Sequence, residues 1–150
     1  MALTYAEKLL DISPAFEDRH IALHQTAMVH RLQGSHSKAL ALLEQEHTLV
    51  AAHGGNPMKF AVNLYEVGML PLLNNDPAKA LHTLEEALGY ARSAADPMTL
   101  GCVHRALGEA HTAMGEPGLA NEELHRALAF FGAAGDAIAC SEVQAMMDKL

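Results

Sequence analysis

A sequence repeat with a period of about 40 residues limits the folds that this chain can adopt. Three alanines, Ala39, Ala80 and Ala120, lie 41 and 40 residues apart. A small residue precedes each alanine by 12 positions, and a leucine follows each by four positions: Ala27, Gly68 and Gly108, then Leu43, Leu84 and Leu124. Small residues at fixed places in a unit indicate two helices in close contact, so the period predicts an array of stacked units.

Each unit is expected to hold two helices, because turn residues occur at its start and in its middle. Asn56-Pro57 and Asp96-Pro97 place a capping side chain and then a proline at a helix start. Apolar residues recur every three or four positions, which favours helix, and no long stretch alternates with a period of two. Pro71 lies inside one expected helix and should kink it or cost about 3 kcal/mol. The expected helices span roughly residues 2–12, 17–33, 37–53, 58–73, 77–94, 98–114, 118–133 and 137–149.

This pattern resembles the tetratricopeptide repeat, in the longer variant found in bacterial regulators. The third unit matches best, with His104, Leu107-Gly108, His111, Ala120, Leu124 and Ala127. The second unit has Leu64, Val67-Gly68, Pro71, Ala80, Leu84 and Ala87, and the weaker first unit has Leu23, Thr26-Ala27, His30, Ala39, Leu43 and Glu46. The family's usual period is about 34 residues. Armadillo and HEAT repeats share the longer period, but they would not explain the small residues 12 positions apart.

The resemblance implies an all-α fold, a right-handed superhelix (solenoid) of antiparallel helix pairs with about eight helices. A single domain is expected over residues 1–150, with a half repeat at 1–15, repeats at about 17–55, 57–95 and 97–135, and a C-terminal helix at 137–150. Because the chain opens in the middle of a unit, we expect it to be a fragment of a longer protein.

Composition and charge argue against several classes of function. The formal net charge is −8, and the lysines and arginines are scattered singly. A nucleic-acid-binding surface is usually a basic stripe, so direct nucleic-acid binding is not expected. The N-terminus lacks a signal-peptide pattern, and no apolar run is long enough to span a bilayer, which favours a cytoplasmic protein without a membrane partner. Cys102 and Cys140 fall in apolar helical runs and are interpreted as core cysteines.

Side chains that could carry catalysis or hold a metal do not form a recognisable constellation. The sequence has no glycine-rich phosphate loop. Glu85-Glu86 and Glu122-Glu123 are adjacent pairs, expected on the solvated outer surface. His20 and His24 are one helical turn apart, a spacing that can hold a metal, but zinc needs three or four converging ligands. We therefore expect no enzyme activity, no catalytic residue, no cofactor and no metal.

The resemblance also implies where a partner would bind, because the first helix of each pair lines the inner surface of such a solenoid. That groove takes a peptide or a helix, so the expected function is a protein–protein interaction module with a regulatory or scaffolding role. The expected groove residues are His24, Met28, Arg31, Tyr65, Met69, Leu72, Arg105, Glu109 and Thr112. The alternative is self-association: a homodimer formed through the terminal helices, including Met146 and Met147, within a larger bacterial signalling or transcription-regulatory protein.

Overall fold

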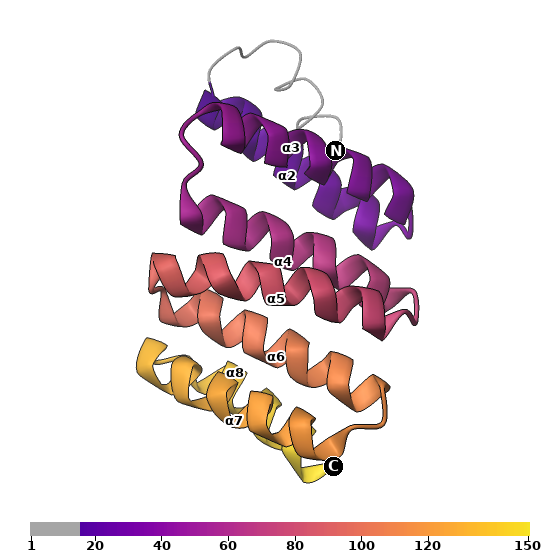
Figure 1. Ribbon diagram of the computed structural model, residues 1–150, viewed down its shortest axis with the longest axis vertical. Helices are drawn as coiled ribbons and strands as arrows, with labels where there is room; N and C mark the ends of the chain where they lie inside the picture. Colours follow the sequence, from indigo (N-terminus) through magenta and orange to yellow (C-terminus); the bar gives the residue numbers. More distant parts are fainter. Residues whose placement is uncertain (1–15) are drawn as a thin grey trace.

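The structure is a computed structural model that describes residues 16–150, and that range contains seven α-helices and no strand (Figure 1). The helices are α2 (Phe16–Leu32), α3 (His36–Ala52), α4 (Pro57–Leu73), α5 (Pro77–Ala94), α6 (Pro97–Ala113), α7 (Pro117–Ala134) and α8 (Ala137–Asp148). Their bounds agree with the expected helices to within one residue. The expected half repeat at 1–15, with its helix at 2–12, lies outside the described residues.

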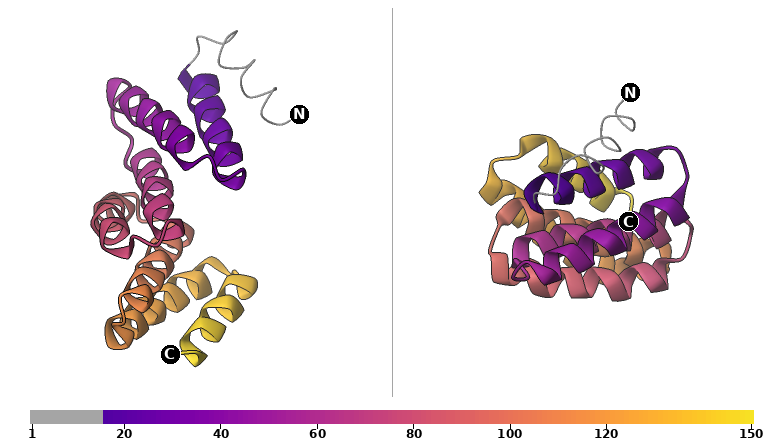
Figure 2. Two further views of the ribbon diagram at one scale, coloured as in Figure 1. Left: turned by 90° about the vertical axis from the view of Figure 1, so that its right-hand side faces the viewer. Right: turned by 90° about the horizontal axis from the view of Figure 1, so that it is seen from above.

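The helices pack as consecutive pairs, α2 with α3, α4 with α5 and α6 with α7, and each pair also contacts the next helix along the chain. Figure 1 shows these pairs stacked along the long axis of the molecule. In the side view of Figure 2 (left), α2 and α8 at the two ends project to the same side, whereas α5 lies on the opposite side. The stack is therefore curved, and the predicted all-α solenoid is confirmed. We call the side toward which α2 and α8 project the inner face, and the opposite side the outer face.

Small residues lie where the two helices of a pair touch, as the repeat predicts. The three repeat alanines are fully buried. A Cβ atom added to Gly68 would lie 2.8 Å from Leu84 Cγ, and one added to Gly108 would lie 2.7 Å from Leu124 Cδ2. Since carbon atoms cannot approach this closely, glycine is required for the observed spacing of α4 with α5 and of α6 with α7.

Side-chain caps define the helix starts. Asn56, Asp76, Asp96 and Asp136 each accept a hydrogen bond from the backbone N–H three residues further on. Such caps satisfy N–H groups that a helix leaves without partners. Pro71 lies in the last turn of α4, which ends at Leu73. The hydrogen bond that this proline removes is therefore close to the helix end. A kink there would change the direction of only the last few residues.

Three clusters of buried apolar side chains run along the stack and hold it together. The first joins α2 and α3 to α4 through Ala27, Leu43 and Leu70. The second fills the space between α4, α5 and α6. The third joins α7 to α8 through Phe131 and Val143. Because each cluster spans neighbouring helix pairs, every pair depends on the next one for part of its core.

Candidate functional site

A chain of polar contacts crosses the inner face from α2 to α8. Arg31 Nη1 on α2 lies 2.6 Å from Glu66 Oε2 on α4. The neighbouring Tyr65 is close enough to Arg105 on α6 for each side chain to influence the pKa of the other. Arg105 Nη1 in turn lies 2.9 Å from Glu142 Oε2 on α8. The structure thus brings Arg31, Tyr65 and Arg105, all predicted groove residues, onto one face formed by the first helices of successive pairs.

The predicted apolar groove residues are half-buried along α2 and α4. Met28 packs against the cluster that joins α2 and α3 to α4. Tyr65, Met69 and Leu72 pack against the cluster between α4, α5 and α6. Burial raises the pKa of Tyr65 to about 12, so its phenol stays protonated at neutral pH. These side chains have one side in the core and the other accessible to a ligand.

The remaining three predicted groove residues have different surroundings. Glu109 is half-buried, with Oε1 3.9 Å from Arg105 Nε, and burial raises its pKa although the arginine charge opposes the shift. Thr112 is exposed, and its hydroxyl donates a hydrogen bond of 2.8 Å to a carbonyl of its own helix. His24 lies against α3, with Nδ1 3.2 Å from Glu46 Oε2. It therefore belongs to a buried polar cluster as much as to the groove.

Sequence reasoning missed a row of exposed apolar side chains in the first turns of α4, α6 and α8. Met58, Met98 and Ile138 are spaced 40 residues apart, and their exposed fractions are 36%, 40% and 75%. The repeat period itself is the signal that would have found them, since it places them at equivalent positions. Met98 and Ile138 line a pocket of about 260 Å³ between α6 and α8, together with Cys102, Arg105 and other residues. The pocket adjoins the polar chain on the inner face, because Arg105 belongs to both.

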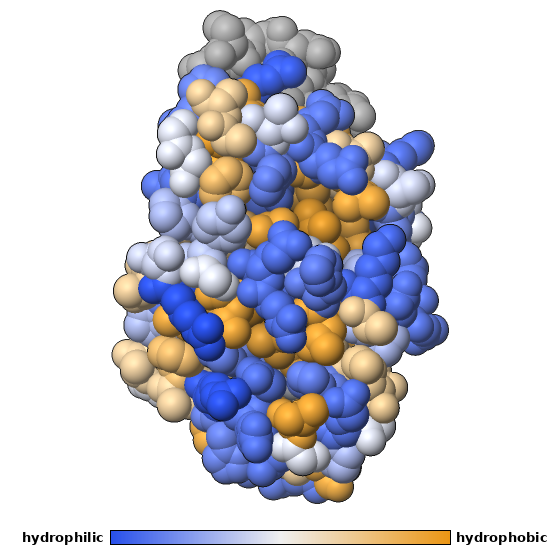
Figure 3. Space-filling model, in the orientation of Figure 1, coloured by the Kyte–Doolittle hydropathy of each residue, from blue (hydrophilic) through white to orange (hydrophobic). Residues whose placement is uncertain are grey.

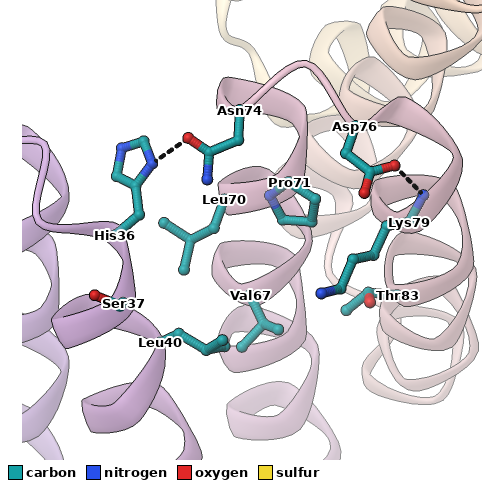
Figure 4. A pocket seen from close by; sticks show the side chains of 10 residues that line it. All are labelled: His36, Ser37, Leu40, Val67, Leu70, Pro71, Asn74, Asp76, Lys79 and Thr83. Atoms are coloured by element: carbon teal, nitrogen blue, oxygen red, sulfur yellow. Dashed lines mark hydrogen bonds between the residues drawn. The ribbon is translucent and has the colours of Figure 1, made fainter.

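A second pocket, of about 300 Å³, opens between α3 and the α4–α5 pair (Figure 4). Its apolar lining comes from Leu40, Val67, Leu70 and Pro71. Figure 3 shows apolar surface on the outer face in the hollow between these helices. At the edge of the pocket, His36 Nδ1 lies 2.7 Å from Asn74 Oδ1. The pocket shows that the junction between the first two helix pairs is incompletely filled.

Glu123 does not lie on the solvated surface, where the sequence pattern placed it. It is half-buried, and Oε2 lies 2.6 Å from Nδ1 of the buried His104 on α6. Burial alone would raise the pKa of Glu123, but the hydrogen bond and charge of His104, with the charge of Arg126, outweigh it and lower the pKa. The expectation was wrong because Glu123 immediately precedes the buried Leu124, at the edge of the helix contact, where a side chain of α6 reaches it.

Neither a metal centre nor a membrane span emerges from the described part of the chain. Within residues 16–150, no group of three or more His, Cys, Asp or Glu side chains is arranged to hold a metal ion. No helix in that range is long and apolar enough to cross a membrane. No protein-family model matches the sequence, and no curated protein matches it. The function has to be inferred from the surface of this chain itself.

Proposed function

We propose that the protein is a tetratricopeptide-like interaction module that binds an apolar peptide segment along its inner face. The observation that carries this proposal is the row formed by Met58, Met98 and Ile138. Met58 shares one face of α4 with the half-buried Tyr65 and Met69, which follow it by 7 and 11 residues. Single exposed apolar side chains are normal on protein surfaces. Three at equivalent positions of successive repeats form a periodic row that an elongated ligand can follow. Methionine suits such a surface because its flexible thioether adapts to varied partners.

The charges of the inner face favour an apolar ligand over an anionic one. Arg31 is paired with Glu66, and Arg105 is paired with Glu142. A phosphate or an acidic motif would have to break these pairs to gain an arginine. An apolar segment can cover the exposed row and leave both pairs intact. The net charge of −8 also disfavours an acidic partner.

The proposal assigns the protein a regulatory or scaffolding role in the cytoplasm rather than catalysis. Binding of this kind acts by bringing a partner to a defined place, and it needs no reactive side chain. The polar groups of the inner face fit such a role, because they are occupied with one another: Glu66 with Arg31, and Glu109 and Glu142 with Arg105.

Selection of peptides from a random displayed library tests this proposal and does not require the natural partner. Binding of the selected peptides is measured by fluorescence anisotropy for the wild type, for Met98→Ser and for Leu119→Ser. Leu119, exposed in the first turn of α7, is the matched control because it is apolar but lies outside the row. We expect Met98→Ser to weaken binding about tenfold and Leu119→Ser to change it by less than about twofold. Equal losses in both variants, or a library without binders, would overturn the proposal.

Self-association is the alternative, and the exposure of Ile138 is the observation that favours it. Met146 and Met147 are half-buried against the cluster that joins α7 to α8 within the same chain. Ile138 is therefore the side chain of α8 that a second copy would most readily cover. Light scattering over a concentration series separates the two proposals. A constant monomer mass supports peptide binding, whereas a dimer that Ile138→Ser dissociates would support self-association.

A further inference from the structure

A buried carboxylate occupies a place that the other two repeats give to alanine. Glu46 follows Leu43 by three residues, as Ala87 and Ala127 follow their own repeat leucines. All three are buried, and Glu46 is only 1% exposed. Removing a carboxylate from water is costly unless hydrogen bonds and an opposite charge compensate for the lost hydration. The surroundings of Glu46 must therefore supply both.

Side chains of α2 and α4 converge on this carboxylate. Asn63 Nδ2 on α4 donates a hydrogen bond of 2.7 Å to Glu46 Oε1, and Asn63 Oδ1 lies 3.3 Å from Nδ1 of His47. On α2, His24 Nδ1 and His20 Nε2 lie 3.2 Å and 3.4 Å from Glu46 Oε2. No donor among the described residues is aligned for a hydrogen bond with this oxygen. Its compensation therefore depends on the positive charge of a protonated histidine.

His24 is the histidine whose surroundings favour the proton. Its hydrogen bond with Glu46 is the largest influence and raises its pKa, while burial opposes the shift. The charges of Glu46 and Glu66 raise the pKa further, and the charge of Arg31 lowers it. The net result is a pKa above the usual 6.5. His24 thus carries the charge that compensates Glu46 at pH values where a free histidine would be losing its proton.

His20 shares the same carboxylate but not the same protonation. Burial is the largest influence and lowers its pKa. Glu46 and Glu17 favour the charged form, whereas Lys59 and His24 oppose it. Two histidines one turn apart repel each other when both are charged. Glu46 is therefore compensated by a single proton, and that proton is on His24.

This cluster lies between the two helix pairs that are joined by the longest connection in the described chain. Residues 53–56 join α3 to α4, whereas only residues 95–96 and 135–136 join the later pairs to the next helix. Gly54 and Gly55 have φ angles of +96° and +64°, a left-handed region that favours glycine. The pocket of Figure 4 also opens between these two helix pairs. Among consecutive helices of the described chain, α3 and α4 also share the smallest contact, so the polar cluster contributes more to this junction.

We propose that the packing of α2 at its junction with α3 and α4 is controlled by the protonation of His24 beside the buried Glu46. With His24 protonated, the buried carboxylate is compensated and α2 is held against α3 and α4. Loss of that proton leaves hydrogen bonds to Glu46 Oε1 from Asn63 and from a neutral His24, but removes the positive charge beside Oε2. Helix α2 then loosens from α3, while Asn63 still joins α3 to α4 and the later helices α6 and α7 are unaffected.

The raised pKa of His24 sets the direction in which stability changes with pH. A histidine whose folded-state pKa is raised stabilises the fold fully below its unfolded value, here 6.5. This stabilisation is lost as the pH rises through the folded-state pKa. Loosening is therefore expected on the alkaline side of 6.5.

NMR titration of the histidines and amide hydrogen exchange test this proposal on the wild type and on Glu46→Ala. Alanine is chosen because it stands at this position in the other repeats, at Ala87 and Ala127. We expect His24 to titrate above 6.5 in the wild type and lower in Glu46→Ala. Protection of the α2 amides, corrected for intrinsic exchange, should fall at least about tenfold between about pH 6 and about pH 9 in the wild type only. His82→Ala removes an exposed histidine beside Glu86 on α5 and should keep the wild-type response.

Glu46→Gln keeps the shape of the side chain without its charge, so it serves if Glu46→Ala does not fold. It too should lower the pKa of His24 and abolish the pH response of α2. A wild-type α2 whose protection is equal at both pH values would overturn the proposal. So would a His24 pKa that is the same in the wild type and in a folded Glu46 variant.

Discussion

Arg31 on α2 and Glu66 on α4 form an ion pair in which Nη1 and Oε2 are 2.6 Å apart, although 35 residues separate them in the sequence. The exposed fractions of the two side chains are 25% and 13%, so water screens their attraction less than it would on an open surface. The pair connects the first helices of two successive units across the inner face. Arg105 and Glu142 form a second such pair between α6 and α8, so both arginines are already matched by a carboxylate.

Removal of Arg31 tests how much the inner face depends on this pair. Arg31→Gln leaves the Glu66 carboxylate half-buried without its opposite charge, and should lower the free energy of unfolding by about 1–3 kcal/mol. Arg31→Gln combined with Glu66→Gln should recover most of that loss, because no charge is then left uncompensated. Denaturant unfolding of both variants measures the difference. A double variant as unstable as Arg31→Gln would contradict the ion-pair explanation.

The close approach of α6 to α7 at Gly108 predicts a specific cost for one methyl group. Gly108→Ala places a Cβ atom 2.7 Å from the buried Leu124 side chain, and should destabilise the fold by about 1–2 kcal/mol. Gly89→Ala is the control, because no atom lies within 4 Å of its added Cβ. That change should stabilise the helix by up to about 1 kcal/mol. Thermal unfolding of both variants checks the prediction, which fails if Gly108→Ala is as stable as Gly89→Ala.

The hydrogen bond between His104 and Glu123 predicts a loss of stability in acid. Because the folded-state pKa of Glu123 is lowered, its stabilising contribution is present above the usual 4.5 and is lost as the pH falls through the folded value. Glu123→Gln should therefore be less stable than the wild type at neutral pH, and the two should converge in acid. Urea unfolding at a series of pH values measures this. If the free energies of unfolding of the two proteins differ by the same amount at every pH, the contact between His104 and Glu123 contributes nothing.

Tyr65 should ionise at a higher pH than an ordinary tyrosine. Burial is the main cause, and the charges of Cys102 and Glu66 add to it, so that the pKa is raised from 10.0 to about 12. The difference between the absorbance titrations of the wild type and Tyr65→Phe should show a phenol titrating near that value. Circular dichroism recorded in parallel shows that the helices persist. A difference signal centred near 10 would mean that Tyr65 is more exposed than the structure indicates.

The repeated helix pairs can be predicted from the sequence because the signals that specify them are local and periodic. The spacing of Ala80 and Leu84, the caps at Asp76 and Asp96, and the glycine at 108 all follow from contacts that recur in each unit. A period of this kind specifies the same contact several times over, so a deviation in one unit does not hide it. Within residues 16–150, the helix bounds and the all-α solenoid are accordingly confirmed.

The polar contacts could not be predicted in the same way, because each occurs once and joins distant residues. Glu46 weakened the match of the first repeat, and nothing in the sequence pointed to Asn63, 17 residues later, as its partner. Glu123 lies next to a buried leucine, and only the position of His104 on the neighbouring helix decides that it is half-buried. The pattern of one repeat cannot specify a contact that the other repeats lack.

Methyl NMR of the methionines, recorded while a library-selected peptide is added, shows whether a peptide binds along the inner face. Met28, Met69 and Met98 report on the inner face, and the exposed Met114 at the turn between α6 and α7 reports on a region outside it. Binding along the inner face predicts that the first three signals shift in a saturable way and that the signal of Met114 stays in place. A peptide that binds and shifts Met114 alone would show that the partner surface lies elsewhere, and would contradict the account.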